Sequence, residues 1–252
     1  MRRRVVTPTR KKLARAGAAF TPTDVKTWRW LGGMLVLGIG AKVAARAQPP
    51  EISLPRPGAV VATHVAGEAF IVSEGERRPI KSDERLRVGA VVATGRKSFL
   101  VLMLSNGASI QLGSESELEV EEFGQSPISG NVKIAELTAE PTLSRTRLRL
   151  LRGDVSIEVK PLKVVRGSSF LISLPAGTMR VGDGTVRAMV RMSDLGLGVC
   201  TLELQKGAAE FEGMGLAYVP MPLGRKLAFA IEVEKATGAI KVGEMPKETP
   251  PK

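Results

Sequence analysis

The acidic side chains that follow residue 114 have the type and the spacing that could do chemistry. Glu115, Glu117, Glu119 and Glu121 alternate with other residues. On an extended strand, alternate side chains share one face at a separation of about 6 to 7 Å. Paired carboxylates could bind a cation or act on a glycosidic bond, but both sites need carboxylates that converge from differing environments. A single row on one strand instead indicates a solvated face.

A second row carries the opposite charge with the same spacing, at Arg145, Arg147 and Arg149. Apolar residues alternate with the charges in both rows and point to the opposite face. Because like charges in a row repel one another, we expect the two rows to lie on neighbouring strands and to pair across them. Coordinates that place the rows on distant strands would contradict this hypothesis.

Few other residues are candidates for chemistry. His64 is the single histidine, which excludes a multi-histidine metal site, and its alternating apolar surroundings predict a surface or half-buried strand position. Gly182-Asp183-Gly184 is predicted to be a turn, because the strand-like residues after it supply no helix for a phosphate loop. Cys200, the single cysteine, lies in an apolar run and is predicted to be a small buried hydrophobe.

The sequence contains none of the common enzyme motifs. The elbow G-x-S-x-G, the Walker sequence, H-E-x-x-H and the dinucleotide fingerprint do not occur. One Tyr and seven Phe, with both Trp in the first 47 residues, leave few aromatic platforms for a sugar or single-stranded nucleic acid. We therefore predict a protein that is not an enzyme, with no cofactor and no catalytic, cofactor-binding or metal-binding residues. Only a pocket in which His64 meets a carboxylate would favour catalysis.

Short apolar segments rich in β-branched residues must position whatever site exists. These segments are 59–65, 69–72, 90–93, 99–104, 109–112, 118–120, 155–159, 170–174, 186–192, 199–204, 227–233 and 239–242. Glycines mark turns between them at Gly67, Gly75, Gly89, Gly95, Gly107, Gly153, Gly167, Gly177, Gly182, Gly184, Gly207, Gly224 and Gly238. Turn signals every ~8 to 12 residues are typical of β-sandwiches, rolls and barrels. The predicted fold is all-β, an antiparallel or rolled β-sandwich or β-roll of many short strands, without an amphipathic helix after residue 50.

Asn106-Gly107 is the sharpest local signal. Both residues tolerate the positive φ of a type I′ turn, and apolar segments flank them. The pair predicts a hairpin of residues 99–104 against residues 108–112.

The same segments resemble the FecR domain of bacterial envelope proteins. The resemblance covers about residues 59–192, and its most specific part is the spaced cluster Thr94-Gly95, Ser98 and Asn106-Gly107-x-Ser109. The other matching residues are Gly67-Glu68-Ala69-Phe70-Ile71-Val72, Pro79-Ile80, Leu86, Gly89, Val92, Val101, Leu104, Leu112, Ser116, Leu118, Leu150, Gly153, Val155, Val159, Phe170, Ile172, Leu174-Pro175 and Gly184-Thr185. Three features depart from the family pattern: Asn106 replaces the usual Asp, Leu174 replaces the usual Thr, and residues 124–144 resemble an insertion.

The resemblance implies a periplasmic or extracytoplasmic β domain that works by binding other proteins. In the best-known members, such a domain senses an outer-membrane transporter and controls a sigma factor through a cytoplasmic domain across one membrane helix. Here the arm before the apolar run has fewer than 30 residues and is Arg-rich, too small for the usual sigma-binding domain. The chain is therefore similar to the members that lack that domain.

The first 47 residues differ chemically from the rest. They hold 11 Lys and Arg against one acid, Asp24, whereas residues 48–252 carry 26 bases and 24 acids. A body this close to neutral lacks the basic surface expected of a nucleic-acid-binding protein. A basic arm, an apolar run at residues 30–41 and small residues at Ala45 and Ala47 together have the pattern of a cleaved export signal. An uncleaved membrane anchor and an organellar transit peptide are the two alternatives.

These features predict five parts of the chain. Residues 1–47 form a basic arm with a hydrophobic signal peptide or anchor, and residues 48–57 form a Pro-rich linker. Residues 58–192 form the FecR-like β domain, residues 193–242 add C-terminal strands, and residues 243–252 form a disordered tail too poor in apolar residues to pack.

We therefore expect a non-catalytic, exported module for protein interaction or signalling in the cell envelope. Its expected partners are envelope proteins, with no nucleic acid. The alternatives are a structural domain or one that binds peptidoglycan or another envelope polysaccharide, and a membrane-anchored regulator. The expected location is the periplasm or the exterior after cleavage near Ala47, or the inner membrane if residues 30–47 remain as an anchor.

Overall fold

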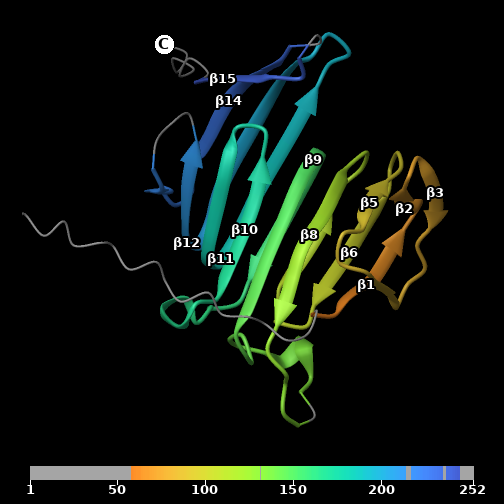
Figure 1. Ribbon diagram of the computed structural model, residues 1–252, viewed down its shortest axis with the longest axis vertical. Helices are drawn as coiled ribbons and strands as arrows, with labels where there is room; N and C mark the ends of the chain where they lie inside the picture. The colour runs from red at the N-terminus through yellow and green to blue at the C-terminus, as the bar shows by residue number, and fades with distance from the viewer. Residues whose placement is uncertain (1–57, 131, 214–216, 235–236, 245–252) are drawn as a thin grey trace, which may run out of the picture. The chain divides into compact units, whose positions relative to one another are not determined.

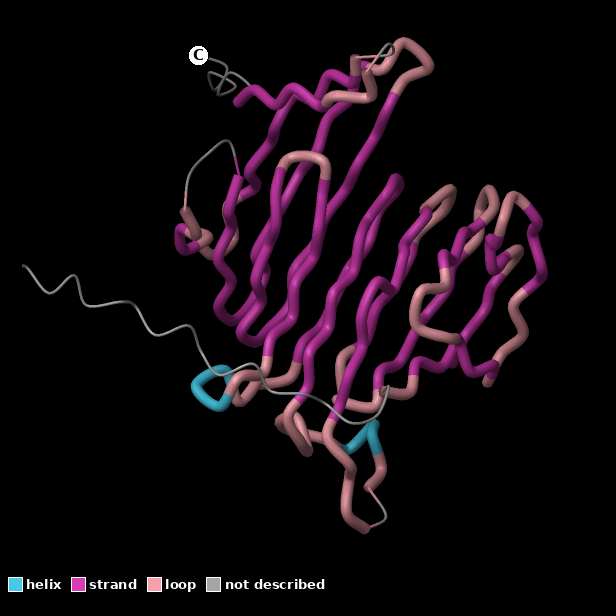
Figure 2. The backbone as a smooth tube through the Cα atoms, viewed as in Figure 1, coloured by secondary structure: helices cyan, strands magenta, loops and turns pink. Residues whose placement is uncertain are grey.

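The computed structural model describes residues 58–130, 132–213, 217–234 and 237–244. The expected leader, the linker and most of the tail lie outside these residues. Regular structure in the described residues is strand, apart from two short 3-10 segments, η1 (Ile134–Glu136) and η2 (Val164–Arg166) (Figure 2). The all-β prediction is confirmed. Within the described ranges, no helix has the length and the apolar character needed to cross a membrane.

The strands of this β domain hydrogen-bond into one open, mixed sheet. In chain order they are β1 (Val60–Ala66), β2 (Ala69–Ser73), β3 (Glu76–Pro79), β4 (Glu84–Leu86), β5 (Val91–Thr94), β6 (Phe99–Leu104), β7 (Ser109–Leu112), β8 (Glu117–Gln125), β9 (Ser144–Val159), β10 (Ser169–Leu174), β11 (Gly177–Met192), β12 (Leu197–Gly213), β13 (Val219–Pro220), β14 (Lys226–Val233) and β15 (Ile240–Glu244). Each of the twelve apolar segments overlaps a strand, to within one residue at its start. β3, β4 and β13 were missed because they are short and lack apolar alternation.

The sheet divides at β9, which lies near its middle (Figure 1). The first half of β9 pairs with β8 and, in parallel, with β10, whereas its second half pairs with β7 and β11. An antiparallel or rolled β-sandwich or β-roll was expected, whereas the parallel β9–β10 pair makes this one open sheet mixed. Gly153 lies between the two halves with φ at +92°, so it bends a strand rather than forming the predicted turn.

β11 pairs with β10 at its start and with the second half of β9 further along, and β12 pairs with β11 along both parts. Gly182, Gly184 and Gly207 were predicted to be turns but lie inside these strands. The register shifts between Val181 and Asp183, which marks a bulge. A Cβ atom on Gly184 would collide with the backbone of Lys206 on the facing strand. The glycines therefore allow two long strands to bend while they remain paired, and a bend of this kind resembles a turn in the sequence.

Alternate strand residues bury one continuous hydrophobic core. Its largest fully buried side chains are Phe123, Phe170, Leu100, Leu102, Leu104, Ile110, Leu112, Leu118, Leu148, Leu150, Ile157 and Ile172. They come from strands on both sides of the division in β9. The two groups of strands are consequently stabilised by the same apolar contacts.

The predicted hairpin of β6 and β7 is confirmed, with Leu100 opposite Leu112. The predicted type I′ turn between the two strands is wrong. Gly107 has φ at +91°, whereas Asn106 is not among the residues with positive φ. The Gly107 N–H donates to the Leu104 carbonyl, and the Leu104 N–H donates to the Ala108 carbonyl. This is a type I turn followed by a left-handed glycine bulge. Asn106 is instead a buried polar residue.

Candidate functional site

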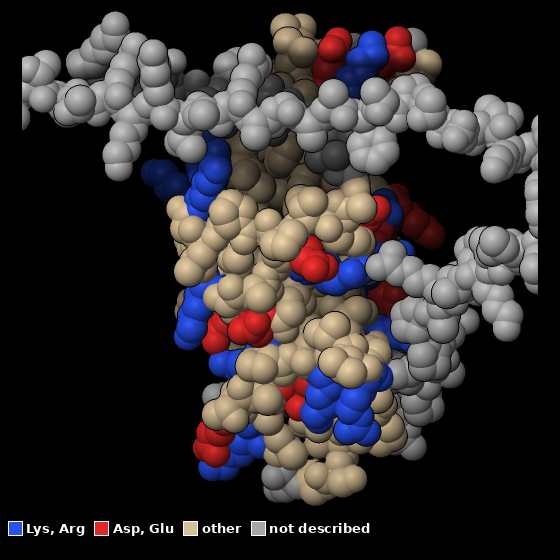
Figure 3. All heavy atoms as spheres, turned by 90° about the vertical axis from the view of Figure 1, so that its left-hand side faces the viewer, with Lys and Arg blue, Asp and Glu red and all other residues tan. Residues whose placement is uncertain are grey.

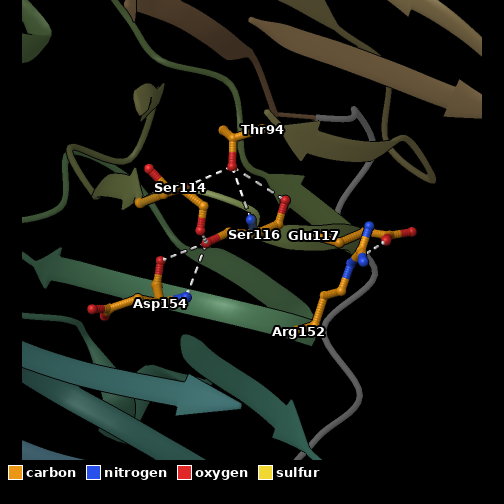
Figure 4. Close-up of polar contacts among 7 residues, drawn as sticks. Thr94, Ser114, Ser116, Glu117, Arg152 and Asp154 are labelled. Carbon is orange, nitrogen blue, oxygen red and sulfur yellow. Dashed lines mark hydrogen bonds and ion pairs between the residues drawn. The ribbon is translucent and has the colours of Figure 1, made fainter. Parts of the chain in front are cut away.

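Thr94 and Ser116, two residues of the sequence pattern, take part in a network of hydrogen bonds (Figure 4). The Thr94 hydroxyl donates to the Gly113 carbonyl at 2.6 Å and accepts the Ser116 N–H at 2.9 Å. The Ser116 hydroxyl accepts the Asp154 N–H at 2.9 Å. These bonds join the end of β5, the turn before β8 and the bend of β9.

Ser98 also stabilises turns through its hydroxyl, between Glu68 and Arg96. Its hydroxyl accepts the Glu68 N–H at 2.9 Å and donates to the Arg96 carbonyl at 3.0 Å. A Cβ atom on Gly67 would lie 2.5 Å from the Ser98 hydroxyl, so Gly67 must be small. In the described residues, no buried side-chain nitrogen or oxygen lacks a hydrogen-bond partner. Thr94 and Ser98 therefore stabilise the turns around them.

The two rows of charge lie on adjacent strands, as predicted. β8 and β9 are antiparallel, with Glu117 opposite Arg152 and Glu119 opposite Arg149. Arg149 forms an ion pair with Glu119 at 3.6 Å and a second with Glu121.

Two details of the rows differ from the prediction. Arg152, which was not counted in the basic row, forms an ion pair with Glu117 at 3.1 Å. Glu115 precedes β8 in a left-handed conformation, with φ at +53°, and is not a member of the acidic row.

The other two arginines of the row, Arg145 and Arg147, line a groove of about 930 Å³. The groove is bounded by β9 to β12, by η2 and by the segment that follows β13. Its apolar lining includes Leu171, Leu204 and Met221. Val164 and Leu223 also line it, although 50% and 65% of their surfaces are exposed. An apolar lining with a few charged groups is the usual composition of a binding site.

A third arginine of the groove is held by its neighbours. Arg180 lies opposite Glu210 on β12 and approaches its carboxylate at 3.5 Å. Its guanidinium also stacks on the ring of Tyr218, at 3.9 Å from the centroid. Partial burial is the main cause that raises the pKa of the Tyr218 hydroxyl, so this phenol stays neutral at physiological pH.

Arg145 and Arg147 differ from Arg180 in this respect. Within the described residues, no acidic side chain approaches either of them to 4.0 Å. Glu122 lies opposite Arg147 in the β8–β9 register, and Gly124, which has no side chain, lies opposite Arg145. The groove therefore has two cationic groups that remain able to bind an anion.

The remaining candidate residues lie away from the groove. His64 is exposed on β1, where its ring meets the Phe99 ring edge-on at 6.3 Å. Cys200 is fully buried, and desolvation raises the pKa of its thiol to about 12, which confirms the prediction of a buried hydrophobe. In the described ranges, no three His, Cys, Asp or Glu side chains are grouped to hold a metal ion.

Charges of both signs are interspersed on one side of the β domain (Figure 3). This surface agrees with the nearly neutral composition of residues 48–252. The groove was missed because its lining comes from segments that are distant in sequence, such as Val164 in η2 and Met221 after β13. The basic row was the only part of it that had a sequence signal.

Comparison with known proteins gives a family match and a weak structural one. Residues 90–210 match the family described as FecR protein. Two crystal structures of a candidate anti-sigma factor from Parabacteroides distasonis align at 9% and 10% identity, each with a TM-score of 0.40. Each alignment covers 61% of this chain and 59% of the other. A comparison with curated proteins gives no match.

Proposed function

This chain carries a FecR domain, and we propose that it is a non-catalytic regulatory module that binds another protein in the cell envelope through the groove on β9 to β12. The observation that carries the proposal is the groove itself. It combines exposed apolar side chains with two arginines that have no described ion-pair partner. The hydroxyls of Thr94 and Ser116, in contrast, are occupied by internal hydrogen bonds.

The leader supplies the proposed location. Its basic arm, apolar run and small residues at Ala45 and Ala47 favour export with cleavage near Ala47. The β domain would then work in the periplasm or outside the cell, and its partner would be an envelope protein. If residues 30–47 are retained, the same domain would be a membrane-anchored regulator.

Photo-cross-linking in the native cells tests the binding role. A photoreactive residue is placed at Leu223, which lines the groove, or at Leu195, which is 72% exposed in the turn between β11 and β12. We expect the Leu223 variant to form a discrete adduct with an envelope protein and the Leu195 variant to form none. Equal adducts from both positions, or adducts from neither, would contradict a binding role for the groove. An adduct with peptidoglycan would instead support the polysaccharide-binding alternative.

A further inference from the structure

The basic row of β9 is divided in two by the partners of its members. Arg149 and Arg152 pair with the glutamates of β8. Toward the start of β9 the acidic row ends, because Gly124 faces Arg145. Arg147 still faces Glu122, but within the described residues no carboxylate approaches Arg147 or Arg145 to 4.0 Å, whereas Arg149 and Arg152 are paired within the fold.

The spacing of these two arginines fits an extended chain. They are alternate residues of one strand, so their side chains leave the same face about 6 to 7 Å apart. Carboxylates on residues i and i+2 of an extended peptide have the same separation. Guanidinium groups bind carboxylates with two parallel hydrogen bonds, which makes arginine well suited to this recognition.

The floor of the groove provides the second half of such a site. Leu171 of β10 lies opposite Arg147 of β9 on one side and opposite Arg180 of β11 on the other. Its apolar side chain therefore separates these two arginines. Leu204 and Met221 extend this apolar lining. Glu122 lies beside Arg147 and would repel a carboxylate placed on its side. An anionic chain would therefore extend from Arg147 toward Arg145 and away from β8's glutamates.

We propose that the groove binds an extended, acidic segment of the partner protein over Leu171, in which carboxylates contact Arg145 and Arg147 on the β9 side. The intervening apolar side chains, which point the opposite way, contact Leu204 and Met221 on the β12 side. The inference rests on the proposed function and adds the chemistry of the partner. Charge complementarity and the apolar lining together favour a peptide over an anionic polysaccharide, which would leave the apolar lining without contacts.

Two labelled peptides test this chemistry on the protein as recovered from its cells. One alternates Glu with Val over ten residues, and the other has Gln in place of every Glu. The variants are the double substitution R145Q/R147Q and the matched control R149Q/R152Q, which removes the same charge from the same strand outside the groove. Fluorescence anisotropy measures binding at low and at physiological salt.

We expect the Glu peptide to bind the unchanged protein roughly ten-fold more tightly than the Gln peptide, with the advantage reduced by salt. R145Q/R147Q should abolish that advantage, and R149Q/R152Q should retain it. The inference is overturned if the two peptides bind equally tightly, or if the two double variants lose the advantage of the Glu peptide to the same extent. It is also overturned if polygalacturonate displaces the Glu peptide from the unchanged protein but not from R149Q/R152Q.

The cross-linking experiment separates this inference from the proposed function. A protein adduct at Leu223 together with equal binding of both peptides would leave the binding role intact and overturn only the acidic chemistry. Absence of the adduct would overturn the binding role itself.

Discussion

At the scale of single residues, the resemblance to the FecR domain depends on side chains that hold turns. Gly153 has φ at +92°, and a Cβ atom there would collide with the Cα and the hydroxyl of Ser116. The Ser116 hydroxyl in turn accepts the Asp154 N–H. The small residue, the positive φ and the hydrogen bond are thus parts of one structural requirement.

Replacement of Gly153 by Ala should destabilise the protein by about 3 kcal/mol or more, since it combines backbone strain with a steric clash. Gly89 provides the matched control, because its φ is +85° but an added Cβ would meet nothing within 4 Å. Gly89→Ala should cost about 1 kcal/mol from strain alone. Urea denaturation of both variants measures the difference, and equal losses would show that contact with Ser116 is unimportant.

Asn106 belongs to a second buried network. Its Nδ2 donates to the Ser144 hydroxyl at 3.1 Å, and that hydroxyl donates to Glu140 Oε2 at 2.8 Å. The other oxygen of the Glu140 carboxylate accepts the Lys163 N–H. Glu140 is only 2% exposed, so the direction of each hydrogen bond in this chain matters.

Asn106→Asp should therefore cost about 2 to 4 kcal/mol, because it removes a buried donor and adds a second carboxylate. The added substitution Glu140→Gln should recover part of that loss. The amide of Gln at position 140 can donate to the Ser144 hydroxyl, and that hydroxyl can then donate to the carboxylate introduced at position 106. A double-mutant cycle by denaturation should give a favourable coupling of about 1 to 2 kcal/mol. Additive losses would contradict the proposed reversal of the chain, and Gln111→Glu on exposed β7 surface controls for charge alone.

At the scale of strands, the sequence predicted which strands exist better than where each strand begins and ends. A continuous apolar run located β6 to the residue, and apolar alternation located β7, since one face of each strand is buried. The apolar pattern truncated β11 and β12, because Gly184 and Gly207 face each other at a bulge that reads as a turn. The type I turn was also missed, because Asn106 is explained by its buried side chain and not by a preference for positive φ.

The paired half of the basic row should contribute little to stability. About half of the side-chain surface of Arg149 and of Arg152 is exposed, at 51% and 53%. Exposed ion pairs are usually worth less than about 1 kcal/mol each, because solvent and salt screen them. We expect Arg149→Gln and Arg152→Gln each to stay within that limit in urea denaturation. A loss of more than about 2 kcal/mol would mean that the row is a main support of the β8–β9 pair.

At the scale of the whole molecule, the sequence predicted the domain type but not the groove on β9 to β12. The FecR match at residues 90–210 follows from turns and strand spacing, which are local and therefore visible in the sequence. The groove requires η2, β11 and the segment after β13 to meet, and no local pattern encodes that meeting. Arg145 and Arg147 were visible as charges, whereas their lack of described partners became apparent only in three dimensions.

The intact mass and the cell fraction of the natively expressed protein test the proposed role of the leader. We expect a soluble exported species that begins at Gln48, since small residues at Ala45 and Ala47 precede it. A membrane-bound chain that still begins at Met1 would replace the exported module by an anchored regulator. An internal control is a variant with Ala45 and Ala47 changed to Leu, in which cleavage at this position should stop.

The most direct test of partner binding in the groove combines its position with its charge. The Leu223 cross-link is measured in cells that express either R145Q/R147Q or R149Q/R152Q, at equal levels of folded protein. Binding through the two unpaired arginines predicts that the adduct disappears in the first variant and persists in the second. An adduct of equal yield in both variants would contradict it.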